Sequence, residues 1–214
     1  MPVTLTIDDK TITTEKGNLL LWAALDNGIY IPHLCALRER SEPYAGCRLC
    51  FVEIEGRPDP VPACTEPVQD GMVVHTRSAS VHRLQRTALE LLLSMHAVDC
   101  GHCPKNRSCE LQKIARHLKV TLKPKRVPTI LKKRPRDESH PLFTYDPNKC
   151  VLCGNCVWVC HEQVKAGILN FAYRGIETVV AAFGGMPLGE AGCSECQACV
   201  DVCPVGALVI KSEE

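Results

Sequence analysis

The residues best suited to chemistry in this sequence are its fifteen cysteines, which recur at short, regular spacings. Closely spaced thiols either oxidise to disulfides or bind metal as thiolates. Disulfides belong to oxidising compartments, and the first residues alternate like strands instead of forming the apolar core of a secretory signal. An odd number of cysteines would also leave one thiol unpaired. We therefore expect a cytoplasmic chain whose thiols bind metal.

The first block has one tight pair of cysteines between two distant ones, in the order C-x11-C-x2-C-x13-C. Two irons bridged by two sulfides need four thiolates, and plant-type [2Fe–2S] proteins combine a tight pair with outlying cysteines. The first gap is longer here, and Gly46 should let the loop approach the core closely. Zinc is the alternative, although zinc ribbons usually show two tight pairs. The expected [2Fe–2S] ligands are Cys35, Cys47, Cys50 and Cys64.

The second block has only three cysteines, so a four-ligand site there needs another residue. His96 precedes them in the pattern H-x3-C-x2-C-x5-C, whereas His102 lies between two cysteines, where its ring would more easily point outward. A Cys3His zinc site is the alternative. A neutral imidazole in place of a thiolate removes one negative charge, so a [4Fe–4S] cluster here should be easier to reduce. The expected ligands are His96, Cys100, Cys103 and Cys109.

The third block repeats C-x2-C-x2-C-x3-C twice, which is the most specific signal in the sequence. In two-cluster ferredoxins the fourth cysteine of each run ligates the other cluster. Pro204 closes the second run, whereas His161 stands at that position in the first. Two zinc sites are the weaker alternative. We expect one [4Fe–4S] cluster on Cys150, Cys153, Cys156 and Cys203, and another on Cys193, Cys196, Cys199 and Cys160.

Composition agrees with a metal-dependent fold. Aromatic residues are only 5% of the chain, so large core-filling side chains are scarce and bound metal should contribute to folding. No apolar run approaches the roughly 20 residues of a membrane span. The formal net charge of +1 counts every cysteine as neutral. With thiolates and four oxidised clusters it becomes roughly −6, which favours protein partners over nucleic acid.

The elements around the first block predict a small sheet crossed by a helix. Val3, Leu5 and Ile7 alternate as in a half-buried strand, and residues 51–54 and 72–76 supply later strands. Asn18 should cap a helix over 19–26, and Gly28 suits the left-handed position after it.

Residues 79–118 predict two helices, the first capped by Ser80 and the second beginning after Cys109. Residues 119–140 contain eight basic residues and three prolines, typical of a solvated, extended linker. A strap that docks on an acidic partner surface is the alternative. Residues 141–214 contain the repeated motif, an internal pair.

With these motifs, the chain resembles the iron–sulfur subunit of the diaphorase half of NAD-reducing nickel–iron hydrogenases. The resemblance rests on G-I-Y-I-P-H-L-C ending at Cys35, G-C-R-L-C ending at Cys50, C-E-L-Q from Cys109, the H-x3-C-x2-C segment and the paired ferredoxin runs. The module is also similar to the front of the complex I large iron–sulfur subunit, of iron-only hydrogenases and of part of NAD-dependent formate dehydrogenases. Those larger chains continue beyond it, which favours the separate hydrogenase subunit.

The resemblance implies a modular α+β fold: a plant-type [2Fe–2S] ferredoxin-like (β-grasp) domain at 1–78, a helical His/Cys [4Fe–4S] domain at 79–118, a basic linker at 119–140 and a two-[4Fe–4S] domain at 141–214. It also implies an electron-relay subunit of an oxidoreductase complex, without a substrate site of its own. Its partners would be a flavin- and NAD-binding diaphorase subunit and the hydrogenase small subunit.

Other interpretations are the same relay in a formate dehydrogenase or electron-bifurcating complex, a free ferredoxin, and a zinc-stabilised interaction module. We find no nicotinamide or flavin fingerprint, because the glycines at 184, 185 and 189 follow no clear strand-to-helix pattern.

Overall fold

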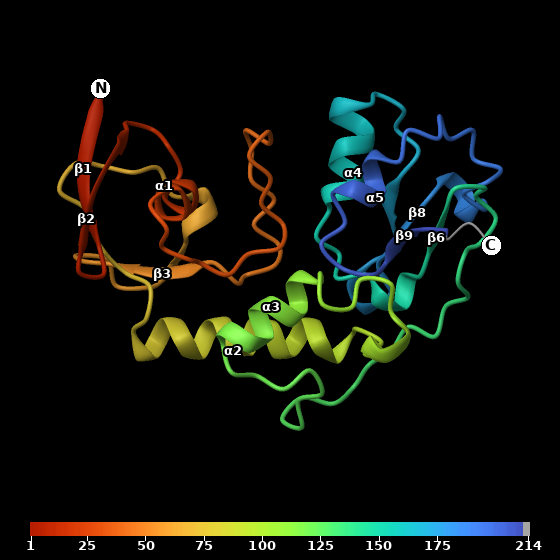
Figure 1. The fold of residues 1–214 in the computed structure, drawn as a ribbon, viewed down its shortest axis with the longest axis horizontal. Helices are drawn as coiled ribbons and strands as arrows, with labels where there is room; N and C mark the ends of the chain where they lie inside the picture. The colour runs from red at the N-terminus through yellow and green to blue at the C-terminus, as the bar shows by residue number, and fades with distance from the viewer. Residues whose placement is uncertain (212–214) are drawn as a thin grey trace. The chain divides into compact units, whose positions relative to one another are not determined.

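The computed structural model describes residues 1–211, which form two compact units (Figure 1). Unit 1 comprises Met1–Leu89, and unit 2 begins at Glu90. Helix α2 (Ala79–Ser94) starts in unit 1, and its last turn belongs to unit 2. Among the described residues, no helix combines the length and apolar character that a membrane crossing requires.

Unit 1 is built on a five-stranded mixed sheet in the order β2-β1-β5-β3-β4. Strands β1 (Pro2–Ile7) and β2 (Lys10–Glu15) form an antiparallel hairpin, and β1 pairs in parallel with β5 (Val73–His75). Strand β3 (Phe51–Ile54) pairs antiparallel with β5 and with the short β4 (Val61–Pro62). A mixed sheet with a single crossing helix is the predicted ferredoxin-like arrangement.

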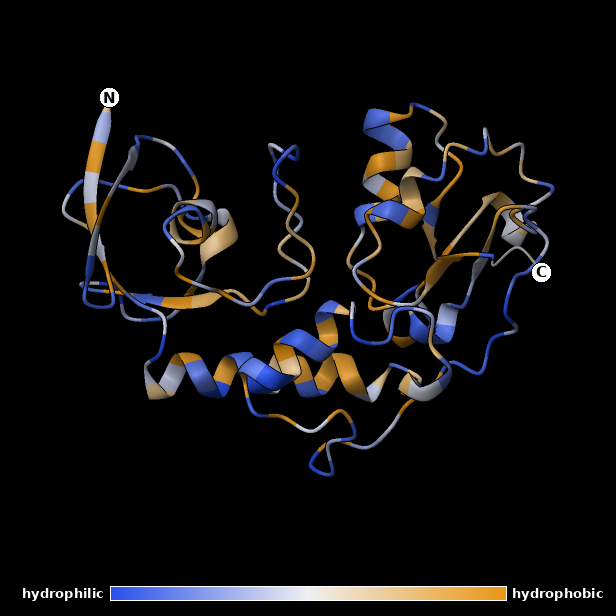
Figure 2. Cartoon of the chain, viewed as in Figure 1, coloured by the Kyte–Doolittle hydropathy of each residue, from blue (hydrophilic) through white to orange (hydrophobic). Residues whose placement is uncertain are grey.

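The core of unit 1 lies between this sheet and helix α1 (Leu20–Asp26). Val3, Leu5 and Ile7 are buried as predicted, and Figure 2 shows the alternation of hydropathy along β1. From α2, Gln85 Nε2 donates to the Phe51 carbonyl oxygen at 3.0 Å, which ties the helix to β3. The packed sheet and helix α1 therefore fix both ends of the chain segment between α1 and β3.

Both predicted helix caps were wrong. Asn18 donates to Thr14 Oγ1, and the cap residue of α1 is Leu19, which offers no side-chain bond. Ser78, not Ser80, caps α2, because Ser78 Oγ accepts from the Val81 N–H at 3.2 Å. Gly28 has the predicted positive φ, at 75°.

Unit 2 contains both the helical His/Cys segment and the repeated cysteine motif. Helix α3 (Glu110–His117) begins directly after Cys109, as predicted, and buries Leu111, Ile114 and Ala115. The N–H of Glu110 donates to the Pro204 carbonyl oxygen at 3.0 Å. These contacts join the helical segment to the second cysteine run, so the two segments pack as one body.

The repeated motif is framed by short elements. Strand β6 (Phe143–Tyr145) pairs with β9 (Leu208–Ile210), and β7 (Asn170–Ala172) pairs with β8 (Val179–Ala181), both antiparallel. The one-turn helices α4 (Asn155–Trp158) and α5 (Ala198–Asp201) lie within the first and second runs. The antiparallel β6/β9 pair holds the segment before the first run beside the segment after the second.

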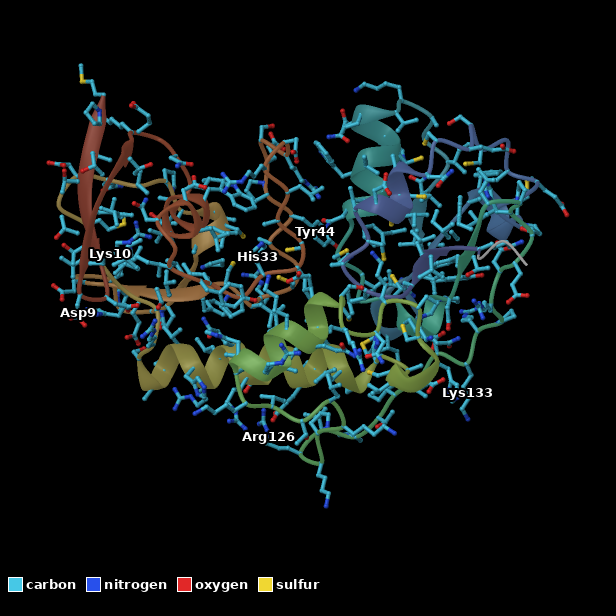
Figure 3. The ribbon with its side chains drawn as sticks, viewed as in Figure 1. Asp9, Lys10, His33, Tyr44, Arg126 and Lys133 are labelled. Atoms are coloured by element: carbon cyan, nitrogen blue, oxygen red, sulfur yellow. The ribbon has the colours of Figure 1, made fainter. Side chains whose placement is uncertain are left out.

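The basic segment before β6 forms no helix and one isolated bridge pair, yet it is bonded to its own unit. Arg126, labelled in Figure 3, forms an ion pair with Glu90, and the Ile130 N–H donates to the Ser94 carbonyl oxygen at 2.7 Å. Asp137 and Tyr145 exchange backbone hydrogen bonds of 2.8 and 2.9 Å. These contacts attach the segment along its length.

Candidate iron–sulfur centres

The four cysteines of the first block are buried and come from three connections of unit 1. Cys35 follows α1, while Cys47 and Cys50 precede β3. Cys64 lies in the 3-10 turn Ala63–Thr65 that follows β4. Because β3 pairs with β4, the Ala63 N–H donates to the Cys50 carbonyl oxygen at 2.9 Å, which brings the last two cysteines together.

These thiols interact in two pairs. A hydrogen bond with Cys47 raises the pKa of the Cys35 thiol, and the same bond lowers the pKa of Cys47. The Cys47 N–H also donates to Cys35 Sγ at 3.4 Å. A hydrogen bond with Cys64, followed by burial, raises the pKa of Cys50 well above its usual value. Two neighbouring pairs of thiols match two irons that each need two thiolates.

The loop before Cys47 has an unusual backbone, with Ala45 and Arg48 at φ of 53° and 54°. We expected Gly46 to allow a close approach to a cluster, and the structure gives a further reason for a glycine at this position. A Cβ at Gly46 would lie within 3.0 Å of the ring of Tyr44, a residue labelled in Figure 3. Gly46 therefore makes room for an aromatic ring beside the cysteine loop.

His96 and the three cysteines of the second block line one small cavity in unit 2, together with Lys149 and Gly206. Burial raises the pKa of Cys109, and the nearby thiols of Cys103 and Cys100 raise it further. The structure thus gathers one imidazole and three thiols around one cavity, those of His96, Cys100, Cys103 and Cys109.

The ring of His96 is oriented by the main chain. Its Nδ1 lies 2.9 Å from the carbonyl oxygen of Lys149, so Nδ1 must carry the proton and donate it. Burial lowers the pKa of the imidazole, which favours the neutral form with a free lone pair on Nε2. Metal-bound histidines typically donate their second nitrogen to a carbonyl or carboxylate in this way. The side chain of His102 is 88% exposed and bonds Asp99 instead.

The fourth cysteine of each run lies near cysteines of the other run. Burial raises the pKa of the Cys150 and Cys156 thiols. The nearby charge of Cys203, from the other run, raises both pKa values further. Burial, together with neighbouring thiols that include Cys160 from the first run, raises the pKa of Cys199 to about 12. These contacts fit the two predicted groups, which are Cys150, Cys153, Cys156 and Cys203, and Cys193, Cys196, Cys199 and Cys160.

The backbones of the two runs repeat each other. Leu152 and Glu195, each two residues after the first cysteine of a run, have φ of 53° and 57°. Gly154 and Gln197, each four residues after it, have φ of 77° and 58° and precede α4 and α5. Successive turns of this kind direct N–H groups into a concave loop that accommodates anions. The Leu152 N–H, for example, donates to Cys150 Sγ at 3.4 Å.

These residues fit iron–sulfur clusters in their donor chemistry. Unit 2 has buried polar atoms without a partner at ordinary hydrogen-bond geometry, and two of them, Lys132 Nζ and Tyr145 Oη, lie near Cys150. Both are donors, which an anionic sulfur would satisfy. Within residues 1–211, no three His, Cys, Asp or Glu side chains converge as ligands of a single metal ion. Thiolates of a cluster, by contrast, are distributed over several irons.

A groove of about 470 Å³ also lies in unit 2, but its lining contains no cysteine. Tyr173, Val180 and Met186 contribute to it, and Arg134 lies over the Tyr173 ring at 4.9 Å from its centroid. The groove therefore does not overlap the groups of candidate ligands.

Three family models match the chain. Residues 1–79 match a 2Fe-2S iron-sulfur cluster binding domain. Residues 85–123 match the NADH-ubiquinone oxidoreductase-G iron-sulfur binding region, and residues 142–164 match a 4Fe-4S binding domain. The chain therefore has the predicted ferredoxin-like modules.

Curated relatives match almost the whole chain but are much longer. The NADPH-Fe(3+) oxidoreductase subunit alpha of Geobacter sulfurreducens is 39% identical over 98% of this chain, which spans 24% of that protein. The NADP-reducing hydrogenase subunit HndD of Solidesulfovibrio fructosivorans is 40% identical over 97% of the chain, which spans 36% of it.

A solved structure is similar over nearly the full length of both chains. It is the NAD+-reducing [NiFe]-hydrogenase in its H2-reduced state, with a TM-score of 0.88 and 34% sequence identity. The match covers 98% of this chain and 88% of the hydrogenase chain. At this identity and coverage, the similarity extends beyond the fold.

Proposed function

Since this chain belongs to the iron–sulfur subunit family of NAD+-reducing [NiFe]-hydrogenase, we propose that it relays electrons between an NAD- and flavin-binding subunit and a hydrogenase module. Four bound clusters would supply one-electron transfer. The observation that carries the proposal is that the predicted ligands lie near one another, with Cys203 close to Cys150 and Cys156 and with Cys160 close to Cys199.

We assign a [2Fe–2S] cluster to the group in unit 1 and three [4Fe–4S] clusters to unit 2. The paired thiols of unit 1 support a two-iron site, and the neutral, oriented His96 supports a fourth ligand beside three cysteines. The proposed domains remain residues 1–78, 79–118 and 141–214, with the basic segment between the last two. The proposed location is the cytoplasm.

Contacts within unit 2 support transfer among its three groups. His96 Nδ1 donates to the carbonyl of Lys149, and the next residue is the candidate ligand Cys150. Cys156 in turn lies close enough to Cys199 for their charges to interact. These contacts support an order that runs from the His96 group through the Cys150 group to the Cys199 group.

Metal analysis tests the proposal against a zinc module. Anaerobically purified chain should contain about 14 iron and about 14 acid-labile sulfide per molecule, and reduction should produce EPR signals. A colourless, zinc-loaded chain that stays silent after reduction and reconstitution would refute it.

Purification of the chain with its natural partners tests the second half of the proposal. Co-purifying flavin and nickel would support the hydrogenase complex. Molybdenum or tungsten instead of nickel would identify a formate dehydrogenase and leave the relay intact.

A further inference from the structure

Lys132 stands apart from the other basic residues of its segment because its ammonium is buried. The main chain holds it at both ends: Ile130 is bonded to Ser94, and Arg134 to Asn148. Asn148 Oδ1 accepts from the Arg134 N–H at 3.0 Å, and its Nδ2 donates to the Arg134 carbonyl oxygen at 2.8 Å. Asn148 lies in the 3-10 turn Pro147–Lys149 that leads directly into Cys150. The segment is thereby fixed beside the first cysteine of the first run.

The ammonium of Lys132 has no hydrogen-bond partner in the protein. A buried charge without a partner is unfavourable, so a compensating group is expected. The acidic group in its surroundings is Glu177, but the Glu177 carboxylate is held by Arg134 at 3.2 Å. Cys150 is the remaining group whose charge attracts Lys132. As a thiolate ligand, Cys150 would supply the missing negative charge.

Tyr145 approaches the same sulfur from strand β6. Its main chain is fixed by two hydrogen bonds with Asp137, and its hydroxyl is buried without a partner at ordinary hydrogen-bond geometry. The hydroxyl lies near Cys150 and Cys156, and its interaction with Cys150 is that of a donor. Two buried donors from different segments thus converge on one candidate ligand.

The other half of the repeat has different surroundings. Its cysteines line a cavity with Phe143, Val159 and Ser194, and Cys196 is exposed. Within the described part of the chain, the residues lining this cavity include no lysine, arginine or tyrosine. The two groups, although repeated in sequence and backbone, therefore differ in nearby positive charge and donors.

We propose that Lys132 and Tyr145 are positioning residues that raise the reduction potential of the Cys150-side cluster above that of its repeat partner. Reduction by one electron adds a negative charge to the site, and a nearby ammonium and hydroxyl donor stabilise that charge. In the reduced chain, the electron then occupies preferentially the cluster of the Cys150 group, which comes after the His96 group in the proposed order. This inference rests on the ligand sets of the proposed function.

A redox titration of the full chain, reconstituted anaerobically and followed by EPR, tests the proposal. Cys150→Ser identifies the signal of the cluster in question. In Lys132→Met, the reduction equilibrium of that signal should become at least tenfold less favourable, a shift of about 59 mV for one electron. Tyr145→Phe should shift it in the same direction by less. Lys132→Arg retains the charge and should stay near the wild-type value.

Lys133→Met is the matched control, because Lys133 is the adjacent, exposed lysine labelled in Figure 3. It should leave every signal unchanged. An equal shift in Lys133→Met, or no shift in Lys132→Met with full cluster content, would overturn the inference while leaving the relay intact. If Lys132→Met loses its clusters, the shift of the same signal in Tyr145→Phe tests the inference, because this variant removes one oxygen and keeps the aromatic ring. A wild-type chain without iron and sulfide would refute the proposed function itself.

Discussion

Gly206 offers a sharp test of the His96 group, because an added methyl group there would collide with a candidate ligand. A Cβ built on Gly206 lies within 3.0 Å of Cys103 Sγ, closer than real Cβ atoms approach other atoms. Hydrogen bonds on both sides of Gly206 restrict movement of its backbone away from Cys103. On one side the Pro204 carbonyl oxygen accepts from the Glu110 N–H at 3.0 Å, and on the other the Ala207 carbonyl oxygen accepts from the Asp146 N–H at 2.8 Å. The sulfur must therefore move.

For Gly206→Ala we expect a loss of about 1–3 kcal/mol in the free energy of unfolding, the usual cost of overpacking. We also expect selective loss of one cluster, because metal–ligand distances tolerate only about 0.2 Å of error. Iron content should fall from about 14 to about 10 per chain, with the other EPR signals retained.

Gly101→Ala is the matched control for this prediction. Gly101 lies in the same cysteine loop, and a Cβ there would meet nothing within 4 Å. It should retain about 14 iron per chain. Full iron content and unchanged stability in Gly206→Ala would refute the steric argument, and equal losses in both variants would show that the loop simply tolerates no substitution.

Three further predictions concern other residues. His96→Cys should lower the potential of one EPR signal, since a thiolate adds negative charge that disfavours reduction; an unchanged spectrum would show that His96 is no ligand. Burial lowers the pKa of His140, whose Nδ1 accepts from the Leu142 N–H at 3.2 Å, so the unfolded chain binds more protons below about pH 6.5. Stability should therefore fall as pH drops below that value, by at most about 1.4 kcal/mol per pH unit, and urea denaturation of His140→Phe should show a smaller dependence. Asp8→Ala removes the acceptor of the Thr76 N–H and hydroxyl, at 2.8 and 2.7 Å, and should cost about 1–3 kcal/mol in urea denaturation. Asp9→Ala, its exposed neighbour, should cost much less, and equal losses would contradict the role of the Asp8 bonds.

The sequence by itself determined the fold class and predicted the membership of each local cysteine group. Candidate ligands such as Cys150 and Cys153 are separated by only two residues, so short-range geometry already places them together. The alternation of Val3, Leu5 and Ile7 likewise predicted the buried face of β1, because side chains alternate across a strand. Helix caps were less predictable, since Ser78 and Ser80 both have suitable side chains and only the structure shows which of them accepts from the helix backbone.

Only the tertiary structure decided the contacts between distant segments. Two of these contacts join residues far apart in the chain: the hydrogen bond from His96 to Lys149 and the close approach of Gly206 to Cys103. The burial of the Lys132 ammonium also depends on distant segments. Their spacing carries no periodic signal, because such contacts depend on how whole segments pack. A basic, proline-containing sequence predicts solvent exposure on average, but it cannot show which of its lysines turns inward.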